Sequence, residues 1–494
     1  MAPFESIGSI FGLVCAINVL NYVDRGLIPG APIQLQAFVQ SVLDVPPENV
    51  SVYIGLLVSA FIAAYSIFIC VFGYLSIRHR PFHLVSIGLF LWVLASALSG
   101  ISKTVASYPL LLTGRFVSGI GESAFQAIMP PFIDQHAPSE KRTFWLGLFG
   151  AAISVGTAIG YSYGSLMAQT AGWDIGFFVA GVVMLPLALV CARFIPMRFD
   201  HPMAYDPAVA TADALRRCID SHSSTADRRA SVTLLGELAS VLRSPLFWTS
   251  TLGYAAYTFT LAGLASFGPV ILIGTGVLSD KVAATVFGAL VVVAGMVGAP
   301  LGGYLVDAAC RGRGTETDFR LVVATRLMFG LVLGGIALAF GAWLAVDSAP
   351  AFLVCMFFSL MLLFMTQSPH QVSILLSVEK PQRGFATGLG LCLMHLLGDV
   401  PSPIVLGWLK DRWAPDCGSV LDHDHIERLN PDCVLHGKTG LTRVLLFAFL
   451  WLGWAALFWG ISYAIAHKKL RRQPKSVVLF DNYNTPVLSR NDSY

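Results

Sequence analysis

The chain has 494 residues, of which 55% are hydrophobic and only 12% charged, and its mean hydropathy is +0.69. A water-soluble protein carries about 25% charged residues, so this chain is too poor in charge to be solvated by water alone, and lipid must cover much of it. The formal net charge of +3 is small and gives no reason to expect a nucleic-acid partner.

Apolar segments long enough to cross a bilayer as helices of about 20 residues recur along the chain. They form two sets of six on either side of a polar stretch at 197–244. We therefore predict an all-α polytopic membrane protein with an N-terminal six-helix bundle at 1–196 and a C-terminal one at 245–467, followed by a tail at 468–494. The predicted spans are 6–29, 52–76, 82–102, 109–132, 144–167, 175–195, 247–273, 283–306, 321–346, 352–378, 385–409 and 441–466.

The loops between the spans differ in their content of Lys and Arg. Basic residues gather in every second loop, in the central stretch and in the tail, whereas the loop at 34–53 contains none. The positive-inside rule then places both termini in the cytoplasm. Within the central linker, residues 231–242 carry apolar side chains at helical spacing, which predicts a short amphipathic helix on the membrane surface.

Two features of the outer loops suggest covalent modification. Most cysteines lie in apolar runs, but Cys417 and Cys433 lie in the polar loop 410–443, where a disulfide is plausible if the loop faces an oxidising compartment. Asn49 begins a glycosylation sequon in another outer loop. Lys410, at the start of the polar loop, is expected to extend its ammonium to the membrane interface.

The two halves share a loop motif. Gly73 and Arg78 follow the second span, and Gly303, Asp307 and Arg311 follow the eighth, at equivalent places in the two sets of six helices. Matching turns at equivalent helices indicate an internal duplication, as in transporters built from structural repeats.

This motif resembles that of the major facilitator superfamily, in which a glycine is followed four residues on by an aspartate and then by basic residues. The second copy fits the pattern, whereas the first has Ile77 at the place of the aspartate. The resemblance implies the major facilitator fold, with twelve transmembrane helices in two pseudo-symmetric bundles. It also implies that Asp307 helps to latch the cytoplasmic gate and that the first half lacks this part of the latch.

Charged residues occur inside two apolar spans. Asp24 and Arg25 lie in the first span, and Arg115 and Glu122 lie in the fourth, where they share one helix face with Gln126. An ionised side chain at bilayer depth costs about 2.5–3.5 kcal/mol on insertion scales, so these groups must pair or face water. Two acids and two bases permit neutral pairing between the two helices. They form either an ion-pair clamp that fixes helix packing or, as we favour, a proton- and substrate-responsive network.

Polar residues in the spans of the second half point to a central cavity. His395 and Asp399 are one helical turn apart in the eleventh span, which allows either a structural hydrogen bond or a proton-sensitive pair. The wall of the seventh span is aromatic and includes Phe259. The residues expected to line the cavity are Gln126, Tyr254, Tyr257, Gln367, His370, His395 and Asp399.

Segments at 21–26, 114–123 and 395–403, among others in both halves, resemble one branch of the superfamily, the Spinster lysolipid and sphingolipid transporters. The resemblance implies a membrane lipid substrate with one acyl chain and a phosphate-bearing headgroup, moved by alternating access. It also implies proton coupling through Asp24 and Glu122, with Arg25 and Arg115 as their partners. A monomer in an endolysosomal or plasma membrane is expected.

Other functions remain open from the sequence. A carrier of small organic anions or drugs and a non-transporting membrane sensor are the alternatives. An enzyme is not expected, because we find no metal-spaced histidine set and no nucleophile elbow. Neither a metal ion nor another cofactor is expected.

Overall fold

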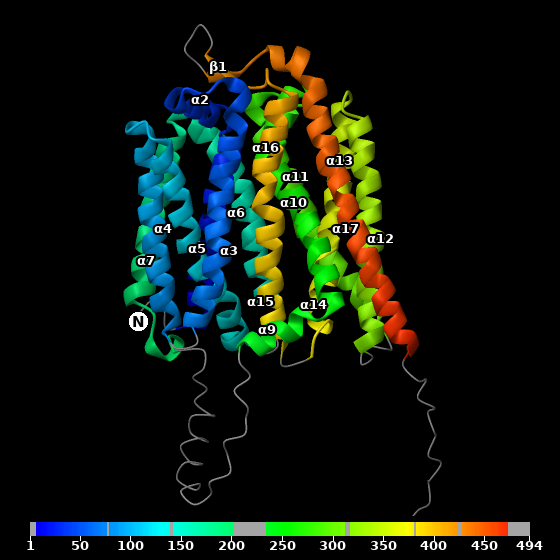
Figure 1. Cartoon of the computed structure of the whole chain (residues 1–494). Helices are drawn as coiled ribbons and strands as arrows, with labels where there is room; N and C mark the ends of the chain where they lie inside the picture. The colour runs from blue at the N-terminus through cyan, green and yellow to red at the C-terminus, as the bar shows by residue number, and fades with distance from the viewer. Residues whose placement is uncertain are drawn as a thin grey trace, which may run out of the picture.

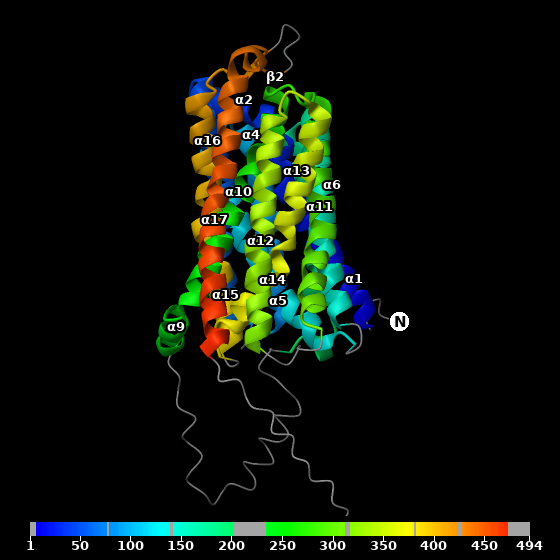
Figure 2. The same cartoon turned by 90° about the vertical axis from the view of Figure 1, so that its right-hand side faces the viewer.

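The computed structural model describes residues 6–76, 79–138, 142–201, 234–311, 317–379, 382–421 and 427–472. In this part of the chain, long helices run side by side along one direction (Figures 1 and 2). Among the described residues, ten helical segments are long and apolar enough to cross a membrane, and two further helices, α5 and α6, have 29 residues each. The predicted fold of twelve spanning helices in two bundles is confirmed.

The described part of the first half contains six long helices and one short helix. The six spans follow one another in the predicted order, and the short helix α2 joins the first two. The helices are α1 (Ile7–Gly30), α2 (Pro32–Leu43), α3 (Val50–Leu75), α4 (Pro81–Thr104), α5 (Tyr108–His136), α6 (Arg142–Thr170) and α7 (Trp173–Arg193), with 3-10 turns at Pro47–Asn49 and Met197–Phe199.

The second half begins with α9 (Leu234–Leu242), which lies where the amphipathic linker helix is predicted. The tenth and eleventh spans are each built from more than one helical piece, and a two-stranded antiparallel hairpin precedes the last helix. The elements are α10 (Pro245–Gly274), α11 (Asp280–Ala309), α12 (Thr317–Leu344), α13 (Ala349–Met365), α14 (Gln367–Leu376), α15 (Arg383–Met394), a π-helix at His395–Asp399, α16 (Pro401–Trp413), β1 (Ser419–Leu421), β2 (Glu427–Leu429), a π-helix at Cys433–Gly437 and α17 (Lys438–Arg472).

The two ends of the molecule differ. α2 and the hairpin lie at one end, which we call the outer end, and α9 lies at the opposite end, which we call the linker end (Figures 1 and 2). The sequence predicts a loop at 34–53, whereas the structure has the helix α2 over its first part, up to Leu43. Pro32 at its first turn suits a helix start, and its apolar side chains Leu35, Phe38 and Val39 are buried against the first bundle.

Helices α1 and α6 pack closely in the first half. A Cβ atom added to Gly160 would lie 2.6 Å from the carbonyl oxygen of Val23, and one added to Gly26 would lie 2.6 Å from the backbone of Gly160. Only glycine permits this approach, which increases van der Waals contact where lipid gives no hydrophobic driving force between helices. The position of α1, and with it of Asp24 and Arg25, is thus fixed by backbone contact.

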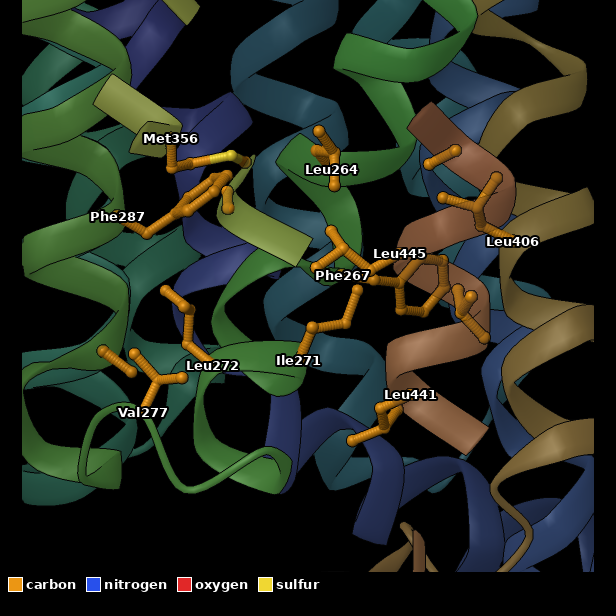
Figure 3. Packing of buried hydrophobic residues seen from close by; sticks show 14 of the residues in the cluster. Leu264, Phe267, Ile271, Leu272, Val277, Phe287, Met356, Leu406, Leu441 and Leu445 are labelled. Carbon is orange, nitrogen blue, oxygen red and sulfur yellow. The ribbon is translucent and has the colours of Figure 1, made fainter. Parts of the chain in front are cut away.

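A large apolar core fills the outer half of the second bundle. Figure 3 shows Phe287 of α11 and Met356 of α13 packed towards Leu264 of α10, with Leu445 of α17 beside it. These side chains are almost completely buried. The core joins four helices of the second half into one rigid wall.

The two halves meet at the outer end. Among the described residues, side chains of α16 bond to the first turn of α3, and the Tyr161 hydroxyl of α6 donates to the carbonyl of Ala265 in α10 at 2.7 Å. The expectation for Lys410 is wrong. Its side chain is only 1% exposed and donates to Ser51 Oγ at 2.7 Å instead of reaching the interface.

Candidate functional site

Four charged side chains in the first half form two ion pairs between α1 and α5. Arg115 Nη1 lies 2.8 Å from Asp24 Oδ2, and Arg25 Nη2 lies 2.6 Å from Glu122 Oε1. The members of the first pair are 3% and 1% exposed, whereas Arg25 is 24% exposed beside a fully buried Glu122. The first pair is therefore almost completely buried, and the second is more open through its arginine.

Aromatic rings surround the guanidinium of Arg25. Its Cζ atom lies 4.7 Å from the ring centre of Tyr22, 4.9 Å from that of Phe61 and 4.8 Å from that of Tyr65. Arg115 lies 4.7 Å from the same Phe61 ring. Cation–π contacts of this kind hold a cation in place without neutralising it, so Arg25 can change its anionic partner and remain stabilised.

The ion pairs do not use all of their hydrogen-bonding groups. Within the described part of the chain, Asp24 Oδ1, Glu122 Oε2 and the Nε atoms of Arg25 and Arg115 have no hydrogen-bond partner. A buried polar atom without a partner costs about 1–3 kcal/mol. The two Nε–H groups can therefore donate to an anionic ligand, and the two carboxylate oxygens can accept from water, once either reaches these buried atoms.

A cavity of about 180 Å³ lies between the two halves beside these pairs. We call it the arginine cavity, since Arg25 and Arg115 line it together with Tyr22, Phe61 and Tyr161. Ala262, Ala265 and Ser266 of α10 form its opposite wall. Two arginines thus face the contact zone between the halves.

A second cavity of about 240 Å³ lies on the other side of α10, against the second bundle. We call it the aromatic cavity because of Tyr254, Tyr257, Phe287 and Phe364 in its wall. It shares Ala262 and Ala265 with the arginine cavity. A positively charged space and a mainly apolar one are therefore neighbours.

The predicted cavity residues divide into two groups. Tyr254, Tyr257, Gln367 and Asp399 line the aromatic cavity. Gln126, His370 and His395 line neither cavity.

The three that line neither cavity have other partners. Gln126 donates to Asn18 Oδ1 at 2.7 Å between α5 and α1, and His370 stacks behind Tyr254 with 3.9 Å between ring centres. Phe259 is also turned away from the cavities and stacks on Trp451.

The predicted pair in the eleventh span is formed in a π-helix. His395 Nδ1 lies 2.6 Å from Asp399 Oδ2, and the turn His395–Asp399 has π geometry. The imidazole ring meets Tyr65 of α3 edge-on at 5.4 Å. Single π turns occur often at functional sites, and this one connects the second half, through Tyr65, to the rings around Arg25.

The loop motif is only partly described. Gly73 and Gly303 lie near the ends of α3 and α11, and Arg78 lies outside the described residues. Asp307 pairs at 3.0 Å with Arg320 of α12 within the second half, and the Arg311 guanidinium lies 6.0 Å from the ring centre of Tyr304. The ion pair between Asp307 and Arg320 therefore does not cross to the first half.

The outer loops carry the predicted cysteines and the sequon. Cys417 and Cys433 are joined by a disulfide beside the hairpin. Asn49 is exposed at the start of α3. Both features lie at the outer end.

Sequence reasoning missed the aromatic residues of the site. Tyr22, Phe61 and Tyr65 lie in apolar spans, where an aromatic side chain is equally suited to lipid. Their alignment with Arg25 depends on how α1 and α3 are rotated, which periodicity does not reveal. Asn18, which pairs with Gln126, was overlooked although its depth in the first span was a signal.

Comparisons with known proteins identify the family and the fold. The sequence profile described as "Major Facilitator Superfamily" matches residues 14–403. The "Probable sphingolipid transporter spinster homolog 1" of Arabidopsis thaliana is 28% identical over 428 residues, which cover 83% of this chain and 84% of that protein. "Protein spinster homolog 1" of Homo sapiens is 28% identical over 426 residues, which cover 82% of this chain and 74% of that protein.

Solved structures share the fold. A bacterial homolog of the human lysosomal transporter Spinster, in an inward-facing and unoccupied conformation, superposes with a TM-score of 0.71 at 16% identity and covers 93% of this chain and 98% of its own. A D-xylose–proton symporter gives a TM-score of 0.59 at 16% identity, with coverage of 90% and 97%. The chain belongs to the major facilitator superfamily and is a multi-pass membrane transporter of the Spinster type, not an enzyme.

Proposed function

We propose that the protein is a proton-coupled transporter of lysophospholipids or phosphorylated sphingoid lipids, which it moves across the membrane by alternating access. The observation that carries this proposal is the position of Arg25. It is held by Glu122, surrounded by three aromatic rings, and exposed to a cavity between the halves. The names of the relatives in Arabidopsis thaliana support a sphingolipid among the substrates.

The headgroup site would be the arginine cavity. A phosphate monoester or diester offers oxygen acceptors that match two guanidinium groups, and such charge-assisted bonds are stronger than neutral ones. The Nε atoms of Arg25 and Arg115 are buried and have no hydrogen-bond partner, so they would donate to a headgroup that enters the site without giving up another bond. This is the chemical reason to expect an anionic headgroup.

The acyl chain would lie in the aromatic cavity. Leu261, Leu264, Val291 and Leu360 supply an apolar wall next to the shared residue Ala265. A single flexible chain can enter beside α10 while its headgroup remains at the arginines.

Proton coupling would use the carboxylates behind the arginines. When Glu122 takes up a proton, it loses its charge and releases Arg25 to the headgroup. When the proton leaves, the carboxylate competes with the phosphate for the same guanidinium and favours lipid release. Asp24 would act on Arg115 in the same way, with less access to water.

Orientation and location belong to the same proposal. The basic loops at the linker end support a cytoplasmic placement of this end and of both termini. An endolysosomal or plasma membrane is proposed, because a solved relative is described as a homolog of a lysosomal transporter.

The test is flux in proteoliposomes under an imposed pH gradient, with lysophospholipids, sphingoid phosphates and water-soluble organic anions as substrates. We expect saturable lipid flux that responds to the gradient, and loss of that response in Glu122→Gln and Asp24→Asn. Asp174→Asn is a matched control, because it breaks a 2.7 Å ion pair with Lys103 at the outer end of the first half. Gradient-dependent flux that persists in both test variants would refute the coupling, and flux of a soluble anion without lipid flux would favour the small-anion carrier.

A further inference from the structure

The first turn of α3 lacks a cap from its own helix. Asn49 occupies the capping position, but its side chain makes no capping hydrogen bond. The first amides of a helix need partners from elsewhere. Here they donate to a carboxylate of the other half: Ser51 N to Asp411 Oδ1 and Val52 N to Asp411 Oδ2, each at 3.1 Å.

The neighbouring lysine completes this contact. Lys410 Nζ donates to Ser51 Oγ at 2.7 Å and lies 3.8 Å from Asp411 Oδ1. Lys410 is 1% exposed and Asp411 is 7% exposed. Both residues belong to α16, and Asp411 is 360 positions from Ser51 in sequence and in the other half of the fold.

The backbones of the two helices touch beside this contact. A Cβ atom added to Gly407 would collide with the carbonyl of Ser51, and one added to Gly55 would collide with the carbonyl of Pro403. α3 and α16 can therefore approach this closely only through these glycines. Because the contact of Lys410 and Asp411 with Ser51 depends on this close approach, it breaks when α3 and α16 separate at the outer end.

We propose that Lys410 and Asp411 are the latch of the outer gate, and that Asp411 holds the gate closed by capping α3 of the opposite half. A carboxylate at a helix N-terminus is stabilised by the free amides and by the helix dipole. These gains exist only while the halves are together. Asp411 also lines a surface depression of about 390 Å³ with Asn49 and Arg412, so water can solvate the carboxylate when the helices separate.

The latch inverts the arrangement expected at the linker end. At the linker end, the loop motif has an aspartate, Asp307, at the end of the eighth span. At the outer end, the acid is Asp411 at the end of the eleventh span, and it caps the first turn of the second span. The two ends of the pathway are then controlled by separate charged contacts. This inference does not depend on the identity of the substrate.

The test is the accessibility of the arginine cavity from the outer side. A cysteine in place of Val58, which lines that cavity, is labelled in proteoliposomes by an impermeant maleimide, and labelling of the chain without this cysteine is subtracted. The protein can insert into the vesicles in either orientation, and added protease cuts the linker only where the linker end faces outwards. Only the uncut molecules are counted, because their outer end faces the added maleimide. No lipid substrate is added, so failure of this proposal is distinct from failure of the transport proposal.

We expect Asp411→Asn and Lys410→Met each to raise the labelling rate at least tenfold. The control is Asp347→Asn, which removes a 2.7 Å ion pair to Lys438 at the same end but within the second half, and it should leave the rate unchanged. Unchanged labelling in the latch variants, or an equal rise in the control, would overturn the proposal. If the latch variants do not fold, Gly407→Leu takes their place, because its side chain forces α16 away from α3. It should raise the labelling rate to the same degree, and an unchanged rate would overturn the proposal as well.

Discussion

Removing Asp24 should destabilise the protein more than removing Glu122, although both acids pair with an arginine. In Asp24→Asn the partner Arg115 remains charged and 3% exposed, and breaking one side of such a buried pair costs about 3–5 kcal/mol. In Glu122→Gln the partner Arg25 is 24% exposed and keeps its three aromatic contacts, so we expect a loss of about 1–3 kcal/mol.

The assay is the free energy of unfolding from titration with a denaturing detergent in mixed micelles. The double variant Asp24→Asn/Arg115→Leu serves as the control, because removal of both partners of a buried pair is often nearly neutral. It should recover most of the stability lost in Asp24→Asn. Equal losses in the two single variants, or a double variant as unstable as Asp24→Asn, would refute the reasoning from burial.

Three further predictions concern the headgroup, the acyl chain and the outer loop. Arg25→Lys keeps the charge but loses the planar guanidinium, so the apparent KM for a phosphate-headed lipid should rise about tenfold in the flux assay; an unchanged KM would place the headgroup elsewhere. Phe364→Ala widens the aromatic cavity and should shift the preference towards longer acyl chains by about fourfold for each buried methylene. Competition between lipids of different chain length measures this preference, and an unchanged order of preference would show that the acyl chain does not lie in this cavity. Cys417→Ser opens a disulfide between positions 16 residues apart and should cost about 3 kcal/mol of unfolding free energy; full stability under oxidising conditions would contradict this.

The spans and the charged residues within them were predictable from the sequence. Hydropathy located the helices because lipid demands long apolar runs, and Asp24 and Glu122 stood out because a charge in such a run is costly. Pairing between the two helices leaves only one choice of partners, Asp24 with Arg115 and Arg25 with Glu122, and the structure has both pairs. The difference in burial between the two pairs was not predictable, because it depends on helix tilt and rotation, which follow from backbone contacts such as that of Gly26 with Gly160.

The contact between the two halves at the outer end was not predicted, for a different reason. Lys410 was assigned to the membrane interface, because a lysine at a helix end in isolation gains most from water. In the fold, the hydroxyl of Ser51 replaces that water. Contacts between segments 360 positions apart leave no local pattern, so the capping of α3 by Asp411 could be recognised only from coordinates.

The burial of Ser51 has a consequence for the maturation of the chain. Ser51 is the third residue of the sequon that begins at Asn49, and a sugar transferase must read this serine together with the asparagine. In the folded protein Ser51 is 0% exposed, and both its amide and its hydroxyl are engaged. A glycan on Asn49 would thus have to be attached before α16 packs against Ser51. Its presence would show that this position was modified before the two halves came together.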